Sequence, residues 1–487
     1  MELHRKGSPL VFGLLFLGTF FFATSNSRAD SLREEHPDDA YLAIPESERR
    51  TSPAPRVQLG GHLSVQVNVD VGGQNIVDDA ANEPSIAIDP TNPDRMAIGW
   101  RQFDSIESNF RQAGFGFSVD GGATWTADVI DPGVFRSDPV LDWNRNGTFF
   151  YNSLNGTFRC DVYRSDDAGA TWDDGVSAFG GDKQWMAVDR TSGTGDGNLY
   201  AAWWHAGGCC FPDMFTRSAN GGASFEEPVE IGEGLRRGTI SVGPDGAVYV
   251  VGHLPNDTGQ IQVGKSTNAN GAASPVSFDS VVDVDLGGPI VRAAGPNPAG
   301  MLGQIWVVAD PSDADRVYVL ASVDPEGPDP LDVYFARSLD GGATWQPPVR
   351  VNDDGGQAWQ WFGALSVAPN GRLDATWNDT RSDPDGFDSV LYHAFSEDHG
   401  ATWSINQPLT PAFDPHLGFP NQDKIGDYHE TVSFNDVVHA AFAATFNGEQ
   451  DIFYLRFAPS SPLFTDGFEL GDFSGWSEIV GGPLMGR

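Results

Sequence analysis

Short apolar stretches separated by polar turns recur along most of this chain. Each unit has an apolar stretch, a turn rich in Asn, Asp, Gly and Pro, and a second apolar stretch, which is typical of two strands joined by a reversal. Seven units lie at 84–100, 138–152, 184–204, 238–253, 304–323, 362–377 and 426–446. Sustained helical periodicity is not found in the sequence. The pattern predicts an all-β repeat protein.

An octapeptide, Ser-x-Asp-x-Gly-x-Thr-Trp, forms a second repeat. Full copies occupy 118–125, 165–172, 338–345 and 396–403, and degraded copies begin at Ser218 and Ser266. The Asp accepts hydrogen bonds from the backbone ahead of it, the Gly supplies a positive φ, and Thr and Trp begin a new strand. We therefore interpret the octapeptide as a hairpin device without catalytic chemistry. Its structural positions are Ser118, Asp120, Gly122, Trp125, Ser165, Asp167, Gly169, Trp172, Ser338, Asp340, Gly342, Trp345, Ser396, Asp398, Gly400 and Trp403.

The octapeptide resembles the Asp-box, or bacterial neuraminidase repeat, of the sialidase superfamily. The resemblance implies a β-propeller in which the box joins the third and fourth strands of a blade, on the face opposite the active site. It therefore concerns the scaffold more than the chemistry.

The seven units predict seven blades of four antiparallel strands. The last unit lacks a fourth strand and an octapeptide, whereas residues 63–71 (LSVQVNVDV) resemble the strands that follow the other octapeptides. We expect this N-terminal strand to close the ring in the last blade, because closure removes exposed sheet edges. The alternative is a six-bladed, sialidase-type ring in which one unit is an excursion.

The two ends of the chain differ in composition from the repeats. Arg5 and Lys6 precede an apolar run at 9–23, which predicts a signal peptide over 1–29 with cleavage after Ala29, although a membrane anchor is an alternative. Residues 30–61 are polar and charged and predict a flexible leader, 62–458 the propeller, and 459–487 a tail. The mature protein is then secreted, extracellular or periplasmic.

The formal net charge is −38, which disfavours nucleic acid and anionic lipid as partners. No later segment is apolar enough to span a membrane. We expect a monomer whose partner is an extracellular carbohydrate or glycoprotein. In an exported protein, Cys160 is expected to form a disulfide with Cys209 or Cys210, the alternative being three buried thiols.

In a propeller, the loops before the innermost strands and those between the second and third strands gather on one face and form a funnel. Indole faces stack on sugars, and carboxylates and guanidinium groups fix sugar hydroxyls. We therefore predict glycan recognition there, the alternative being that central Arg–Asp pairs only neutralise each other. The candidate ligand-binding residues are Arg101, Asp138, Lys183, Trp204, His205, Arg237, Trp361, Asp379 and Arg381.

The resemblance to sialidases also implies a catalytic set of three arginines, a Tyr nucleophile activated by a Glu, and an Asp acid/base. Asp104, Tyr428 and Glu430 are the candidates for that chemistry. However, Glu83 stands where the family has its first arginine, and a carboxylate there would repel an acidic substrate. A glycoside hydrolase of exo-sialidase type is therefore an alternative, and a non-catalytic protein-interaction propeller is a second.

No obligate cofactor or metal is predicted. One loop carries Asp379, Asp383, Asp385 and Asp388, whose carboxylates are suitable ligands for a structural calcium ion. The alternative is a solvated acidic loop.

Overall fold

A computed structural model describes residues 39–204, 208–232, 234–255, 257–271, 275–290, 295–297, 303–383, 386–422 and 424–459. All of them belong to one compact unit, Glu35–Arg487. The predicted signal peptide and most of the tail lie outside the described residues. No helix in the described part of the chain is long and apolar enough to cross a membrane.

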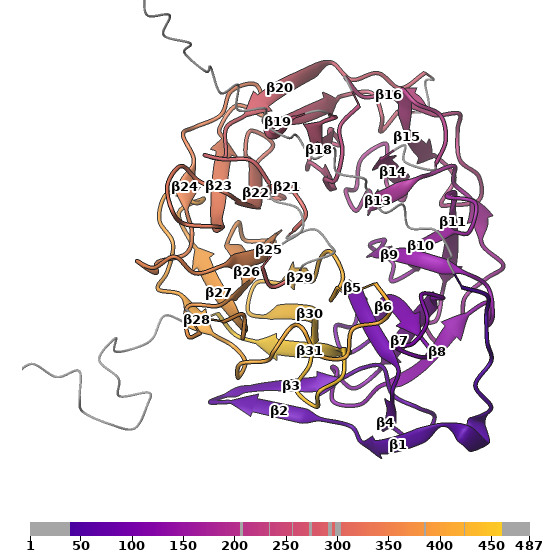
Figure 1. The fold of residues 1–487 in the computed structure, drawn as a ribbon. Coiled ribbons are helices and arrows are strands. Elements are labelled where there is room, and N and C mark those ends of the chain that lie inside the picture. Colours follow the sequence, from indigo (N-terminus) through magenta and orange to yellow (C-terminus); the bar gives the residue numbers. More distant parts are fainter. Residues whose placement is uncertain are drawn as a thin grey trace, which may run out of the picture. The chain divides into compact units, whose positions relative to one another are not determined.

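Seven sheets stand around a central axis and form a seven-bladed β-propeller (Figure 1). The first six blades each contain four consecutive antiparallel strands, the first of which is innermost. Their bounds, blade by blade, are β5 (Ala80–Ile88), β6 (Met96–Phe103), β7 (Gln112–Ser118) and β8 (Thr126–Ile130); β9 (Arg136–Trp143), β10 (Phe149–Asn155), β11 (Cys160–Ser165) and β12 (Val176–Ser177); β13 (Asp182–Val188), β14 (Leu199–Trp204), β15 (Asp213–Ser218) and β16 (Val229–Glu230); β17 (Ile240–Val242), β18 (Val248–Leu254), β19 (Asp257–Ser266) and β20 (Ser280–Val284); β21 (Trp306–Ala309), β22 (Val317–Val323), β23 (Asp332–Ser338) and β24 (Val349–Arg350); and β25 (Gln360–Val367), β26 (Leu373–Asp379), β27 (Val390–Ser396) and β28 (Gln407–Pro408).

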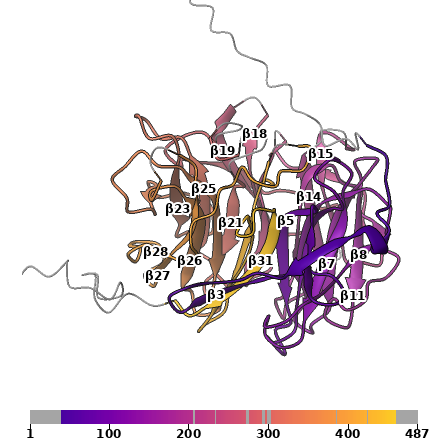
Figure 2. The same ribbon diagram turned by 60° about the horizontal axis from the view of Figure 1, so that its bottom comes forward.

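The seventh blade joins the two ends of the chain, as predicted. Its order is β29 (Glu430–Ser433), β30 (Val438–Ala444), β31 (Asp451–Phe457), β3 (His62–Gln66) and β2 (Arg56–Leu59). Figure 2 shows β3 alongside β31, and Val65 pairs with Tyr454. The closing strand is shorter than predicted, because the side chain of Asn68 replaces the backbone and accepts the amide of Ile452 at 2.9 Å. Seven sheets exclude the six-bladed alternative.

The predicted flexible leader is wrong for part of its length. β2 pairs with β3 through a turn at Gly60 (φ +55°), and β1 (Arg50–Pro53) pairs with β4 (Gln74–Val77). A short 3-10 turn, η1 (Glu46–Glu48), precedes β1. The charged composition of this segment concealed the alternation of Val57 and Leu59, whose side chains are half-buried. A glycine at the turn permits the positive φ that the hairpin needs.

Each full octapeptide connects the third and fourth strands of its blade. In the first copy the Ser118 hydroxyl donates to Asp120 at 2.8 Å, and Asp120 accepts the backbone N–H of Thr124 at 3.0 Å. The same two contacts recur in the other three full copies. The Trp that ends the motif packs toward the preceding blade, as Trp125 does on Tyr454.

Side chains also join neighbouring innermost strands. Ser85 accepts the amide of Leu141 at 2.8 Å, and Ser366 accepts that of Ser433 at 2.9 Å. Other neighbouring blades are linked in the same way, by backbone amides that donate to the side chains of Asp142, Thr239, Ser241, Ser322 and Glu430. In each case a backbone amide of an innermost strand is satisfied by a side chain of the preceding blade.

The predicted disulfide from Cys160 is wrong. Cys209 and Cys210 bond each other, and Cys160 is a buried free thiol. The Cys160 thiol lies against the Gly180–Gly181 backbone and donates to the Gly181 carbonyl at 3.9 Å, while the Cys209 amide donates to the carbonyl of Gly180. This glycine pair therefore contacts Cys160 and Cys209 alike and occupies the space that a bridge would need.

Candidate functional site

The innermost strands begin with a strained backbone. Glu83, Asp138, Lys183, Arg237 and Phe362 all have φ between +47° and +59°. Four of them lie at register shifts between the first and second strands of their blades. A non-glycine residue in this region costs about 1–3 kcal/mol, and such strain concentrates at functional sites. Four of the five residues are charged, so the strain places charge at the leading ends of the inner strands.

Six ionisable side chains meet at this end of the ring, and we call them the axial cluster. All are 7% exposed or less. The set contains equal numbers of carboxylates and cations: Glu83, Asp138 and Asp427, with Arg101, Lys183 and Lys424.

Two lysines bridge the carboxylates of the axial cluster. Lys424 Nζ lies 3.0 Å from Asp427 Oδ2 and 3.8 Å from Glu83 Oε1. Lys183 Nζ lies 3.3 Å from Asp138 Oδ2 and also pairs with Asp427. Arg101 Nε lies 3.2 Å from Glu83 Oε2. The cluster therefore forms one connected network across several blades.

Burial and charge act differently on two carboxyl groups of the axial cluster. Burial raises the pKa of Glu83 to about 8, although Arg101 and Lys183 oppose the shift. Burial also disfavours ionisation of Asp427, but the charges of Lys183 and Lys424 outweigh it and hold the pKa of Asp427 well below its usual range. At neutral pH, Glu83 is therefore mainly protonated beside an ionised Asp427.

Several acceptor oxygens at this level have no hydrogen-bond donor among the described residues. They are both carboxyl oxygens of Glu83, Oε1 of Gln184 and Oε1 of Gln304. Glu83 and Gln304 each stand six residues before the aspartate that directly follows their inner strand, Asp89 and Asp310. Buried polar atoms are normally satisfied, so these acceptors fit a ligand that brings donors.

The structure places the predicted ligand-binding residues in several environments. Arg101, Asp138 and Lys183 belong to the axial cluster. Arg237 stacks over Trp204, with its guanidinium carbon 4.8 Å from the ring centroid. Trp361 is fully buried and donates to Ser389 at 3.1 Å, as a packing residue does. His205 lies outside the described residues.

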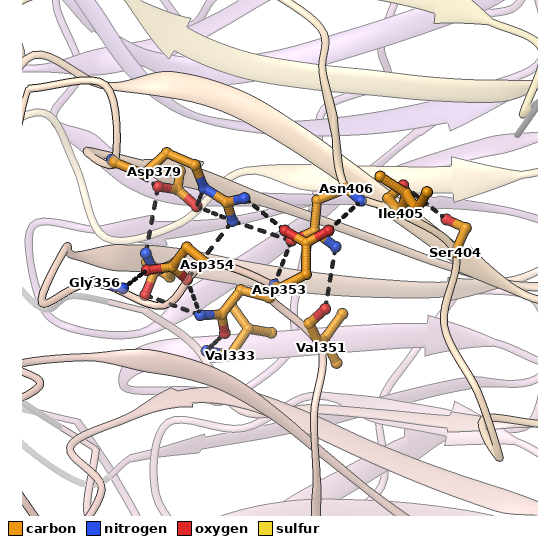
Figure 3. A network of polar contacts seen from close by, with 12 residues as sticks. Val333, Val351, Asp353, Asp354, Gly356, Asp379, Ser404, Ile405 and Asn406 are labelled. Carbon is orange, nitrogen blue, oxygen red and sulfur yellow. Dashed lines mark hydrogen bonds and ion pairs between the residues drawn. The ribbon is translucent and has the colours of Figure 1, made fainter. Parts of the chain in front are cut away.

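Asp379 and Arg381 form a network of their own (Figure 3). Asp379 accepts hydrogen bonds from Trp377 and Arg381, each at 2.8 Å. Arg381 also donates to Asp353 at 2.6 Å and to Asn406 at 3.0 Å. No ion pair among the described residues joins this network to the axial cluster.

The three catalytic candidates, Tyr428, Glu430 and Asp104, each contact different residues. Tyr428 donates to the Pro139 carbonyl at 2.7 Å, and burial raises its pKa well above the usual range. Glu430 accepts the amide of Ile86 at 2.9 Å, and burial raises its pKa to about 8. Asp104 is paired at 4.0 Å with Arg49. A phenol in this state is not activated as a nucleophile.

The acidic loop proposed for calcium is only partly described, since Asp385 is outside the described residues. Asp383 accepts the backbone amide of Asp388 at 3.0 Å, and Asp379 is engaged by Arg381. Within the described ranges, no three His, Cys, Asp or Glu side chains are arranged to hold a metal.

A cavity of about 550 Å³ lies between the downstream halves of the inner strands. Trp185 and Trp306 contribute to its wall, and their rings pack at 5.1 Å. Trp185 also packs on Tyr428, which precedes β29. The leading ends of the strands and this cavity are therefore connected through one aromatic group.

Lys424 is the member of the site that sequence reasoning missed. It lies in the long segment between β28 and β29, whose path no repeat predicts. Glu83 lies near the start of β5, as Asp138 and Lys183 do in β9 and β13, and Asp427 lies three residues before β29, so their positions follow the repeat.

No protein-family model and no curated protein sequence matches this chain. Similar solved structures include a protein of unknown function from Dyadobacter fermentans, with 14% identity, a TM-score of 0.45, and coverage of 83% of this chain and 99% of that one. The phage phi92 endosialidase has 8% identity and a TM-score of 0.44 over 88% of this chain and 72% of its own. The Trypanosoma rangeli sialidase has 13% identity and a TM-score of 0.38 over 84% and 60%. Likenesses at this level say nothing of activity.

Proposed function

We propose that this protein binds an extracellular carbohydrate at the axial cluster, through the hydroxyl groups of the sugar. The observation that carries the proposal is the set of buried acceptor oxygens on Glu83, Gln184 and Gln304 that accept no hydrogen bond from a described residue, although the Glu83 carboxyl group also lies 3.2 Å from Arg101. A sugar hydroxyl donates one hydrogen bond and accepts others, so it matches carboxyl and amide oxygens together with the ammonium groups of Lys183 and Lys424. The extracellular setting follows from the predicted signal peptide.

The charge balance of the axial cluster favours a neutral sugar over an acidic one. Arg101 is engaged by Glu83, and Arg381 is engaged by Asp379 and Asp353. Binding a carboxylate bidentately requires guanidinium N–H donors that are not already engaged. The ligand class is therefore a neutral glycan.

Glycan-array screening of the full mature chain, followed by calorimetry on the best ligand, tests this proposal. Glu83→Gln replaces a carboxyl group by an amide of similar size and is expected to weaken binding about tenfold or more, which is about 1.4 kcal/mol. Glu397→Gln, at an exposed position, is the matched control. Absence of any bound glycan, or equal affinity of Glu83→Gln and the parent, would refute the proposal.

Glycoside hydrolysis is the second candidate function, and the unequal ionisation of Glu83 and Asp427 favours it. A protonated acid beside an ionised carboxylate is the pair that sugar hydrolysis uses. Both groups lie within 4 Å of Lys424 Nζ. Turnover of neutral aryl glycosides that is lost in Asp427→Asn would establish this function in place of simple recognition.

An exo-sialidase would instead cleave a fluorogenic sialoside and lose that activity in Tyr428→Phe. Silence in the binding assay and in both activity assays favours a protein-interaction propeller.

A further inference from the structure

A second group of buried carboxylates lies where the first and last strands of the ring meet. Asp79 precedes β5, Gln66 ends β3, and Asp451 begins β31, with the half-buried Glu449 two residues before it. We call these four residues the seam cluster. Asp79, Asp451 and Gln66 are 2% exposed or less. Ring closure thus concentrates negative charge at one buried point.

The carboxylates of the seam cluster contact only neutral donors. Asp451 accepts the amides of Asn68 and Asn447, each at 2.7 Å. Asp79 accepts the amide of Gln102 at 2.9 Å. No ion pair joins any of the three carboxylates to a lysine or arginine within the described ranges. Buried charges in proteins are paired or coordinate a metal, and here the described residues supply no cation.

Two oxygens of the seam cluster have no partner at all among the described residues. They are Oδ1 of Asp79 and Oε1 of Gln66. The amide nitrogen of Gln66 is already used, since it donates to Asn75 at 2.6 Å, so the orientation of the amide is fixed by its other contacts. These oxygens are buried acceptors beside mutually repelling carboxylates.

Electrostatics within the cluster point the same way. Burial, followed by the charge of Asp451, raises the pKa of Asp79 well above its usual range. Burial likewise raises the pKa of Asp451 to about 7, while the amides of Asn68 and Asn447 favour its ionised form. Both shifts are those expected of buried carboxyl groups that lack a nearby counter-charge.

We propose that the seam cluster binds one Ca²⁺ ion through Asp79, Asp451 and the amide oxygen of Gln66. No three acidic, histidine or cysteine side chains are arranged for a metal in the described ranges, and the proposed ligand set therefore includes the amide oxygen of Gln66, which has no partner among the described residues. Ca²⁺ accepts carboxylate and amide oxygens in flexible geometry and completes its shell with water, whereas Mg²⁺ demands a stricter octahedron. Bound there, the ion ties β3 to β31 and stabilises the closed ring.

Calorimetry and thermal unfolding of the chelator-stripped full chain test this inference. We expect one Ca²⁺ per chain, a rise in Tm of about 3–5 °C at a hundred times Kd, and weaker binding of Mg²⁺. Asp79→Asn is expected to weaken Ca²⁺ binding at least tenfold. Asp383→Asn, at a half-buried position in the acidic loop, is the control and should bind Ca²⁺ as the parent does.

A second measurement covers the case in which Asp79→Asn does not fold. Tb³⁺ luminescence in the parent, excited through tryptophan, should rise on binding and be competed by Ca²⁺, because Trp100 donates to Gln102, which in turn contacts Asp79. Absence of Ca²⁺-dependent heat and Tm change in the parent, equal Ca²⁺ affinity of Asp79→Asn, or loss of binding in Asp383→Asn would each overturn the proposal. Glycan binding does not enter these readouts.

Discussion

Around Lys183, three buried carboxylates face three cations, whereas at the seam three carboxylates face only amides. The two groups have the same number of acids, although Glu449 at the seam is only half-buried, and they differ in what neutralises them. The axial cluster contains its own counter-charges, Arg101, Lys183 and Lys424. The seam cluster must take protons or a cation from solution. The free energy of unfolding should therefore respond to substitutions of the cations in the axial cluster, and to pH and added cations at the seam cluster.

The largest effect is expected from a substitution that removes a cation from the axial cluster. Lys183→Met removes the ammonium group that contacts both Asp138 and Asp427 and should lower the free energy of unfolding by about 3–5 kcal/mol. Urea denaturation measures it, with Lys265→Met, at a half-buried position, as the control. Adding Asp427→Asn to Lys183→Met removes one of the two carboxylates that lost this partner and should recover part of the loss. A cost below about 1 kcal/mol for Lys183→Met would contradict the comparison.

The next effect is a pH dependence at the seam. The pKa of Asp451 is about 7 in the folded protein and lies near 4 in the unfolded chain. Its contribution to stability is therefore complete below about pH 4 and is lost as the pH rises through 7, with a slope of up to about 1.4 kcal/mol per pH unit. Urea titrations in chelator from pH 4.5 to 7.5 should show a shallower fall for Asp451→Asn than for the parent. Parallel curves would show that Asp451 does not titrate in this range.

A smaller effect is expected at the seam cluster, where removing a charged group should raise the free energy of unfolding, whereas at the axial cluster it should lower it. In chelator at pH 8, Asp79→Asn should raise the free energy of unfolding by up to about 1 kcal/mol, because it removes a buried acid that has no counter-charge. Thermal unfolding compares it with the parent in chelator and in saturating Ca²⁺. The order of stability should reverse when Ca²⁺ is added, and an unchanged order would argue against an uncompensated acid at this position.

The smallest effect comes from an ion pair near the seam that solvent already screens. Arg50 and Asp78 pair with side chains 68% and 57% exposed. Arg50→Ala should change the free energy of unfolding by less than about 0.5 kcal/mol. A larger loss in urea denaturation would mean that β1 contributes more to closure than its exposed pattern indicates.

The sequence predicted those parts of the fold whose cause is local. The octapeptide makes its hydrogen bonds within five residues, and the inner strands have continuous apolar faces, so both could be recognised from spacing. Closure by residues near 63 was predicted because one blade lacked a strand. The β2–β3 hairpin was missed, because its alternation is short and lies among charges.

The candidate site was less predictable because its members come from distant segments. Asp138 and Lys183 follow the repeat and were named, whereas Lys424 comes from a long connection with no repeat to position it. The Cys209–Cys210 bond depends on where the Gly180–Gly181 backbone lies. The seam cluster joins Asp79 to Asp451 only after closure, and no local pattern indicates that meeting.

Joining the first strands to the last also fixes an order of events during synthesis. The contact between Asn68 and Ile452 spans 384 positions. Six blades can assemble from neighbouring segments as they leave the ribosome, but β3 must wait with an unpaired edge until β31 exists. Because the entropy of closing so long a loop grows only with the logarithm of its length, the wait is decided by translation time rather than by the closure itself. A chaperone that shields a bare strand edge would therefore act on this protein mainly before its last fifty residues are made.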